Sequence, residues 1–171
     1  MLKLINAFVD ICLFRIGPQD LPCSVPLLGI VVLADSLIGI VLMSIDRSIN
    51  EAVPIVIISL GIIVFVLRFL LAVTNHPERF VQALMAVTGS GFLFSLVVWP
   101  VLMWAYHLRE IDVDNSVPVL LYYIIAFWNI AVLAYIFRHA LSVTIAVGAG
   151  IAILYVIINE VIISGLFPMA A

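Results

Sequence analysis

VPIVIISLGIIVFVLRFLLAV, residues 53–73, decides the fold, because a single charge, Arg68, stands in an apolar run long enough to cross a bilayer. A transmembrane α-helix needs about 20 consecutive, mostly apolar residues. Four other stretches meet this requirement, so that the expected spans are 25–44, 53–73, 79–108, 117–137 and 140–164. The sequence therefore predicts an all-α, polytopic membrane bundle of five transmembrane helices in a single domain, 1–171.

The overall composition also indicates that the bilayer is the solvent of this chain. Of its 171 residues, 66% are hydrophobic and 10% are charged, and the mean hydropathy is +1.36. A water-soluble domain is about one quarter charged, and this chain has too few charges to cover a water-facing surface. With seven Lys or Arg in total, it also lacks the clustered basic residues that a nucleic-acid partner requires.

The segment before the first span, residues 1–16, is expected to be an amphipathic helix lying in the membrane interface. Lys3, Asn6 and Asp10 share one helical face, while apolar side chains occupy the other. Such a two-sided helix lies along a membrane surface rather than across it.

Residues 17–24 are expected to form an elbow between this surface helix and the first span. Gly17 and Pro18 should stop the helix, and Pro22 should keep the chain extended, because a proline disfavours helical geometry at the residue before it. Arg15 lies where anionic headgroups would hold it, and Asp20 can accept hydrogen bonds in the turn. These five residues are also candidates for contact with a partner or a lipid.

The distribution of basic residues predicts the orientation in the membrane. With five spans, the basic residues on the side of the N-terminus are Lys3, Arg15, Arg68, Arg79 and Arg138. The other side holds only Arg47 and Arg109. The positive-inside rule then places the N-terminus in the cytoplasm and the C-terminus in the periplasm of a bacterial inner membrane. Cys12 and Cys23 would lie on the reducing side, where free thiols are expected.

Three of the ionisable residues in the expected spans are candidate site residues: Asp35, Arg68 and Glu160. Asp35 lies near the middle of the first span and Arg68 in the last third of the second. In a hairpin their depths would differ by about 7 Å at 1.5 Å per residue, which an arginine side chain can cover. An Asp35–Arg68 pair could be structural or an ion relay, and Arg68 could instead snorkel to the interface. Glu160, near the outer interface, could be solvated by headgroup water or serve as a polar site.

The fifth span has a pattern of small residues that predicts close helix packing. Ser142, Ala146 and Gly150 recur at four-residue spacing, which lets another span or a second subunit approach closely. Thr144, Gly148 and Ala152 follow the same spacing. Aromatic residues are also expected to form an interfacial belt on the outer side, around the acidic loop 109–115 between the third and fourth spans. They are Trp99, Trp104, Tyr106, Tyr122, Tyr123 and Trp128.

Sequence motifs for catalysis are not found. The three histidines have no HExxH or similar spacing, the two cysteines form no CxxC, and the glycine clusters lack a GxGxxG context. No catalytic residue, metal ligand or cofactor site is therefore expected. The expected partners are membrane lipids and the helices of other membrane proteins, in a hetero- or homo-oligomer.

The layout of the chain resembles the Yip1-type membrane domain. The shared features are an interfacial N-terminal segment, five closely spaced spans, a cytoplasmic N-terminus and an outer C-terminus. GPQDLP, residues 17–22, is similar to the proline-bearing segment before the first span in small bacterial members. The chain lacks the long cytosolic region of the eukaryotic members. The resemblance implies a membrane organiser or adaptor rather than an enzyme, and it transfers no functional residue to a numbered position.

Three classes of function remain open from the sequence. A scaffold, adaptor or accessory subunit of a membrane assembly is favoured by short loops and few intramembrane charges. A small oligomeric transporter or channel that uses Asp35 and Arg68 is the alternative. A membrane-embedded lipid-modifying enzyme would need polar residues near one interface, which only the elbow and the acidic loop 109–115 provide.

Overall fold

The protein was analysed as a computed structural model that describes residues 2–168, in which the regular elements are all helical. The helices are α1 (Leu2–Cys12), α2 (Val25–Met43), α3 (Ile49–Val73), α4 (Phe80–Glu110), α5 (Ser116–Leu141) and α6 (Ile145–Leu166), with 3-10 turns η1 (Pro18–Asp20) and η2 (Pro77–Arg79). The five helices α2 to α6 are long and apolar enough to cross a membrane. The predicted all-α membrane bundle is confirmed.

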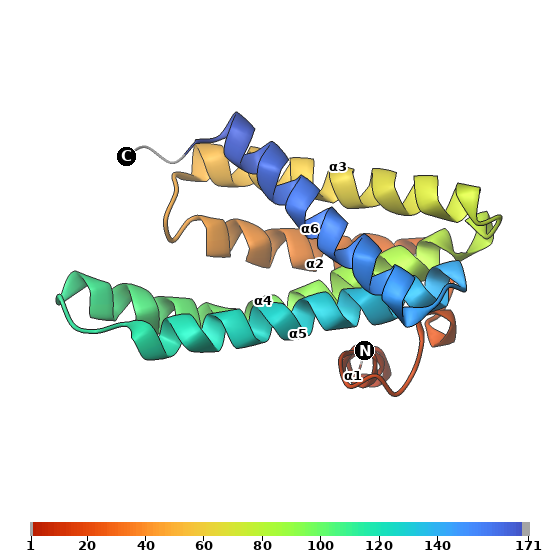
Figure 1. Ribbon diagram of the computed structural model, residues 1–171, viewed down its shortest axis with the longest axis horizontal. Coiled ribbons are helices and arrows are strands. Elements are labelled where there is room, and N and C mark those ends of the chain that lie inside the picture. The colour runs from red at the N-terminus through yellow and green to blue at the C-terminus, as the bar shows by residue number, and fades with distance from the viewer. Residues whose placement is uncertain (1, 169–171) are drawn as a thin grey trace.

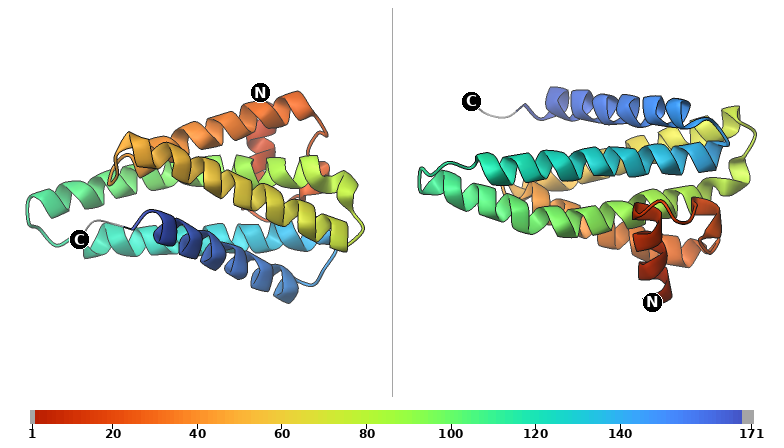
Figure 2. Two further views of the ribbon diagram at one scale, coloured as in Figure 1. Left: turned by 90° about the horizontal axis from the view of Figure 1, so that it is seen from above. Right: turned by 60° about the horizontal axis from the view of Figure 1, so that its bottom comes forward.

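Helices α2 to α6 run lengthwise in the bundle, and α1 lies across them against α4 and α5 (Figures 1 and 2). One end of the bundle carries the elbow 17–24 and the connections 74–79 and 142–144, near which Arg68, Arg79 and Arg138 lie; we call it the basic end. The opposite, acidic end carries the connections 44–48 and 111–115. This placement agrees with the segregation of charge expected from the sequence.

The first half of α4 is the centre of the bundle. All the residues from Ala83 to Ser90 are buried, which requires neighbours on every side of the helix. Helices α1, α2, α3 and α5 supply them. Small residues permit this crowding, and Gly89 shows it most clearly, because a Cβ atom there would overlap the ring of Phe8 from α1.

Helix α6 packs on α5 through the second of the two small-residue rows. Gly148 and Ala152 are buried, whereas Ser142, Ala146 and Gly150 are exposed. A Cβ atom on Gly148 would lie 3.1 Å from the backbone nitrogen of Arg138 and closer still to the carbonyl oxygen of Ala134. Helices α5 and α6 therefore approach each other closely at Gly148 and Ala152, and not at the row of Ser142, Ala146 and Gly150.

Several helix ends differ from those expected. Helix α1 ends at Cys12 rather than at residue 16, because Phe14 adopts a left-handed conformation with φ of 60°. Helix α5 extends to Leu141, beyond the expected start of the fifth span at 140, and Ser142 closes it with φ of 56°. Thr144 then begins α6, since its hydroxyl accepts a hydrogen bond from the backbone N–H of Val147.

We expect Gly148→Ala to destabilise the protein, because the added methyl group meets backbone atoms of α5 that cannot rotate away. The free energy of unfolding should fall by about 1–3 kcal/mol, which is the usual cost of overpacking. The matched control is Gly150→Ala, where an added Cβ has no neighbour within 4 Å. Thermal unfolding of both variants in mild detergent tests this, and equal midpoints would contradict the assigned packing face.

Candidate functional site

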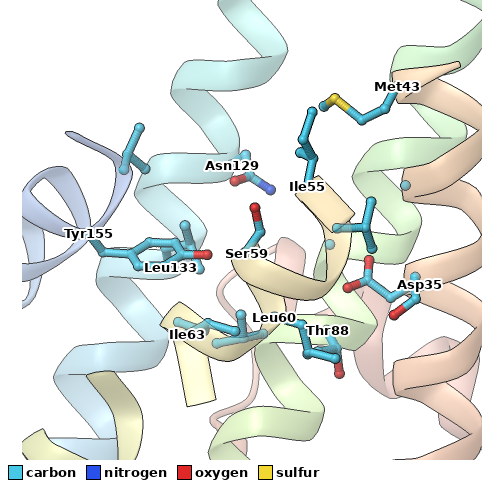
Figure 3. A pocket seen from close by; sticks show the side chains of 16 residues that line it. Asp35, Met43, Ile55, Ser59, Leu60, Ile63, Thr88, Asn129, Leu133 and Tyr155 are labelled. Atoms are coloured by element: carbon cyan, nitrogen blue, oxygen red, sulfur yellow. The ribbon is translucent and has the colours of Figure 1, made fainter. Parts of the chain in front are cut away.

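A partly open cavity of about 270 Å³, which we call the polar cavity after the polar side chains in its wall, lies among the spanning helices. All five spanning helices contribute to its wall, as Figure 3 shows in part. The polar wall residues are Asp35 and Ser36 from α2, Ser59 from α3, Thr88 from α4, Asn129 from α5 and Tyr155 from α6. The rest of the wall is mainly aliphatic, so these polar groups are the part of the cavity that can recognise a ligand.

The polar groups of the wall lie deep in the bundle. Asp35 and Tyr155 each follow the start of their helix by about ten residues, or about 15 Å at 1.5 Å per residue. Asn129 lies near the middle of α5. The hydrocarbon core of a bilayer is about 30 Å thick. This part of the cavity is therefore far from both ends of the helices, where water would otherwise solvate it.

The pattern of α2 turns Asp35 toward the interior. The buried residues Leu28 and Val31 precede it by seven and four positions and share its face of the helix. Leu33 and Leu37, on other faces, are 65% and 64% exposed. Asp35 thus lies on the face of α2 that packs on α4, and Leu33 and Leu37 lie on faces that lipid can contact.

The carboxylate of Asp35 has no partner of opposite charge. It lies against α4, where its Oδ1 atom would be 3.1 Å from a Cβ atom placed on Gly91. The ion pairs formed by residues 2–168 join Arg15 to Asp10, Arg47 to Glu51 and Arg79 to Glu78, and so leave Asp35 out. An isolated carboxylate is unfavourable in an apolar medium. Asp35 therefore needs either a proton or a bound cation.

The expected Asp35–Arg68 pair is not formed. Arg68 is exposed near the basic end of α3, and its guanidinium group stacks over the ring of Phe80 at 4.6 Å from the centroid. Asp35 faces the cavity between the helices. The difference arises because depth along a hairpin does not fix the face of each helix, and Arg68 has an aromatic partner at the first residue of α4.

The elbow is attached to the bundle through its backbone carbonyl groups. The side-chain amide of Gln82 donates hydrogen bonds to the carbonyl oxygens of Gln19 at 3.1 Å and Leu21 at 2.7 Å. Within the elbow, the N–H of Gly17 donates to the carboxylate of Asp20 at 2.8 Å. Pro18 is buried, as expected of a rigid joint.

The other elbow candidates lie on the surface. Arg15 and Pro22 are exposed, and the guanidinium group of Arg15 lies 3.4 Å from the carboxylate of Asp10. These two positions are therefore accessible for contact with lipid or a partner. Pro18 is not, because the bundle covers it.

Trp128 does not belong to the outer aromatic belt. Its indole N–H donates to the carbonyl oxygen of Cys12 at 3.0 Å, and its ring packs edge-on against Phe94. Tyr135 lies about two turns further along α5. Its hydroxyl donates a hydrogen bond to the carbonyl oxygen of Phe14 at 3.2 Å. Both side chains satisfy carbonyl groups that the end of α1 leaves without helical partners.

Glu160 lies apart from the cavity. It is exposed in the second half of α6 and is not among the wall residues. Its neighbour Asn159 has a buried side-chain oxygen without a hydrogen-bond partner. Within residues 2–168, His, Cys, Asp and Glu side chains do not gather in groups of three that could hold a metal ion.

Five polar wall residues were not singled out from the sequence: Ser36, Ser59, Thr88, Asn129 and Tyr155. Each is a polar residue in the interior of an apolar span, which is the signal that could have identified it. Single polar residues in a span give no indication of the face on which they lie, so their convergence with Asp35 required the structure.

We expect the two cysteines to differ sharply in reactivity. Cys12 is buried in α1, outside the spanning helices, and burial raises the pKa of its thiol to about 11. The thiol therefore remains protonated and unreactive at pH 8, while exposed Cys23 can be alkylated. Mass spectrometry after N-ethylmaleimide treatment should show one adduct on the native protein and two after denaturation. Two adducts on the native protein would contradict the docking of α1, and Cys23→Ser provides the control.

Comparison with known proteins does not assign this chain to a family. No protein-family model matches the chain, and comparisons with curated proteins and with solved structures give no match either. The resemblance to the Yip1-type domain therefore stays a prediction, and the functional argument depends on the geometry of the chain itself.

Proposed function

We propose that this chain is a small membrane transporter whose transported or coupling cation binds at Asp35 in the polar cavity. The observation that carries the proposal is the unpaired carboxylate facing a cavity to which all five spanning helices contribute. Ionisable groups at such positions characterise ion pathways and proton relays in membrane proteins. Arg68, which the sequence associated with the same role, has no part in it, because it lies at the basic end over Phe80.

The chemistry of the wall favours a proton or a small cation over an anion. Asp35 supplies negative charge, and the remaining polar groups, such as Ser59, Asn129 and Tyr155, offer neutral oxygen atoms. Among residues 2–168, no Lys, Arg or His lines this cavity. A bound cation would also provide the charge compensation that the carboxylate lacks.

A scaffold or accessory subunit is the second candidate, and the short connections favour it. Within residues 2–168, the segments outside the helices are short: 13–17, 21–24, 44–48, 74–76, 111–115, 142–144 and 167–168. A partner would therefore have to bind mainly through the lipid-facing surfaces of the helices. This function needs no ligand at Asp35, and that difference separates the two candidates.

We expect Asp35→Asn to abolish cation-dependent charge movement, because the amide keeps the shape of the carboxyl group and loses its charge. Reconstituted protein on a solid-supported membrane can be tested with rapid steps of H⁺, Na⁺, K⁺ and methylammonium. The unfolding midpoint should stay equal or rise, since an uncompensated buried charge is removed. The matched control is Glu160→Gln, which removes an exposed carboxylate of a spanning helix outside the cavity.

Two outcomes would contradict the transporter. One is an Asp35→Asn variant whose currents equal those of the unmodified protein. The other is an unmodified protein that gives no current with any of these cations. Stable copurification of another membrane protein in the latter case would support the scaffold.

We further propose that the basic end faces the cytoplasm of a bacterial cell. The support is the concentration of Arg68, Arg79 and Arg138 there, which the positive-inside rule assigns to the cytoplasmic side. Exposed Cys23, in the elbow at this end, is a natural reporter. A membrane-impermeant maleimide should label Cys23 in inside-out vesicles and leave it unlabelled in intact spheroplasts. Labelling in spheroplasts would reverse the orientation.

A further inference from the structure

A second cavity, of about 440 Å³, lies at the basic end and is separate from the cavity of Asp35. Its wall residues are Gln19, Arg79, Arg138, His139, Ser142 and Val143. None of the six lines the cavity of Asp35. Two arginines, a histidine, a glutamine and a serine therefore contribute to one wall, and among residues 2–168 no Asp or Glu lines it.

Arg79 is fixed in the wall by the end of α5. Its Nη1 atom donates to the carbonyl oxygens of His139 and Ala140, each at 3.2 Å, and to the hydroxyl of Ser142 at 2.7 Å. These contacts use one end of the guanidinium group and satisfy the carbonyls at the end of the helix. Its charge is therefore held beside the cavity, with only exposed Glu78 nearby, at 3.9 Å.

Arg138 is the exposed cation of the cavity. It is exposed on the last turn of α5 and takes part in none of the ion pairs formed by residues 2–168. His139 makes a 2.9 Å hydrogen bond through Nδ1 to the carbonyl oxygen of Tyr135, which leaves Nε2 unused. Two guanidinium groups beside one cavity repel each other, and an anion between them would relieve that repulsion.

The elbow brings Gln19 to the same cavity. The side chain of Gln19 folds over Gly17 and occupies the space that a Cβ atom there would need. The backbone carbonyl of Gln19 is meanwhile held by Gln82. Gly17 thus leaves room for this conformation of the Gln19 side chain, and the nearby carboxylate of Asp20 accepts a hydrogen bond from the N–H of Gly17.

We propose that this cavity binds a phosphate group. Arginine presents a planar set of N–H donors that matches phosphate oxygens, and Gln19 and Ser142 add neutral donors. The cavity lies where α5 ends and the turn to α6 begins, at the end of the bundle to which α1 is connected. A basic pocket at such a position suits the headgroup of an anionic phospholipid, and a free phosphate would offer the same oxygens. This inference is independent of cation binding at Asp35.

The test uses the full chain, purified in mild detergent and depleted of lipid. Thermal unfolding is followed against increasing dihexanoyl phosphatidylglycerol, dihexanoyl phosphatidylcholine or sodium phosphate. The variant is Arg138→Gln, because Arg138 is exposed and unpaired whereas Arg79 holds the turn together. The control is Lys3→Gln, which removes one exposed positive charge from α1, outside the cavity.

Phosphatidylglycerol should raise the unfolding midpoint of the unmodified protein and of Lys3→Gln. Arg138→Gln should need about tenfold more of it for the same effect, as expected for loss of a charge-assisted hydrogen bond. No effect of free phosphate at equal concentration would identify a lipid headgroup as the source, whereas an equal effect would identify phosphate itself. The proposal fails if neither raises the midpoint, if phosphatidylcholine acts as strongly as phosphatidylglycerol, or if Arg138→Gln responds like the unmodified protein.

Discussion

Backbone carbonyl groups that lack a helical partner need another hydrogen-bond donor where water is scarce. At the basic end of this bundle, side chains from other helices meet that need. Side chains of α4, α5 and η2 supply the donors. They satisfy the end of α1 through Trp128 and Tyr135, the elbow through Gln82, and the end of α5 through Arg79. Because each bond joins segments that are distant in sequence, these carbonyls determine where α1, the elbow and the turn to α6 can lie.

The two cavities are chemically opposite, and α4 with its preceding turn connects them. Thr88 and Gly91 belong to the wall of the cavity that holds Asp35, while Arg79, just before α4, belongs to the basic cavity. The buried run between them packs on neighbours from all sides. Closely packed helices of this kind transmit small displacements instead of absorbing them. A single closely packed helix thus connects the two cavities.

The number of spanning helices could be predicted from the sequence, because the length of an apolar segment is a local property and the thickness of the bilayer determines the length that is needed. The sequence also identified Asp35, whose charge is conspicuous in an apolar span. It did not identify the partner of Arg68, since Phe80 contacts it only after the turn between α3 and α4 has formed. The two rows of small residues in α6 were equivalent in sequence, and only the packing of α5 distinguishes Gly148 from Gly150. Long-range contacts of this kind depend on the faces that helices present, which spacing alone does not determine.

The hydrogen bonds of the elbow also have a consequence for biosynthesis. Residues 2–24 leave the ribosome before the donors that fix them, which are Gln82, Trp128 and Tyr135. The docking of this segment is therefore complete only after the fourth spanning helix, α5, has been inserted. An amphipathic helix is suited to that delay, since it can rest in the interface without a protein partner. Part of the docking surface, on α4, is thus made before α5 completes it.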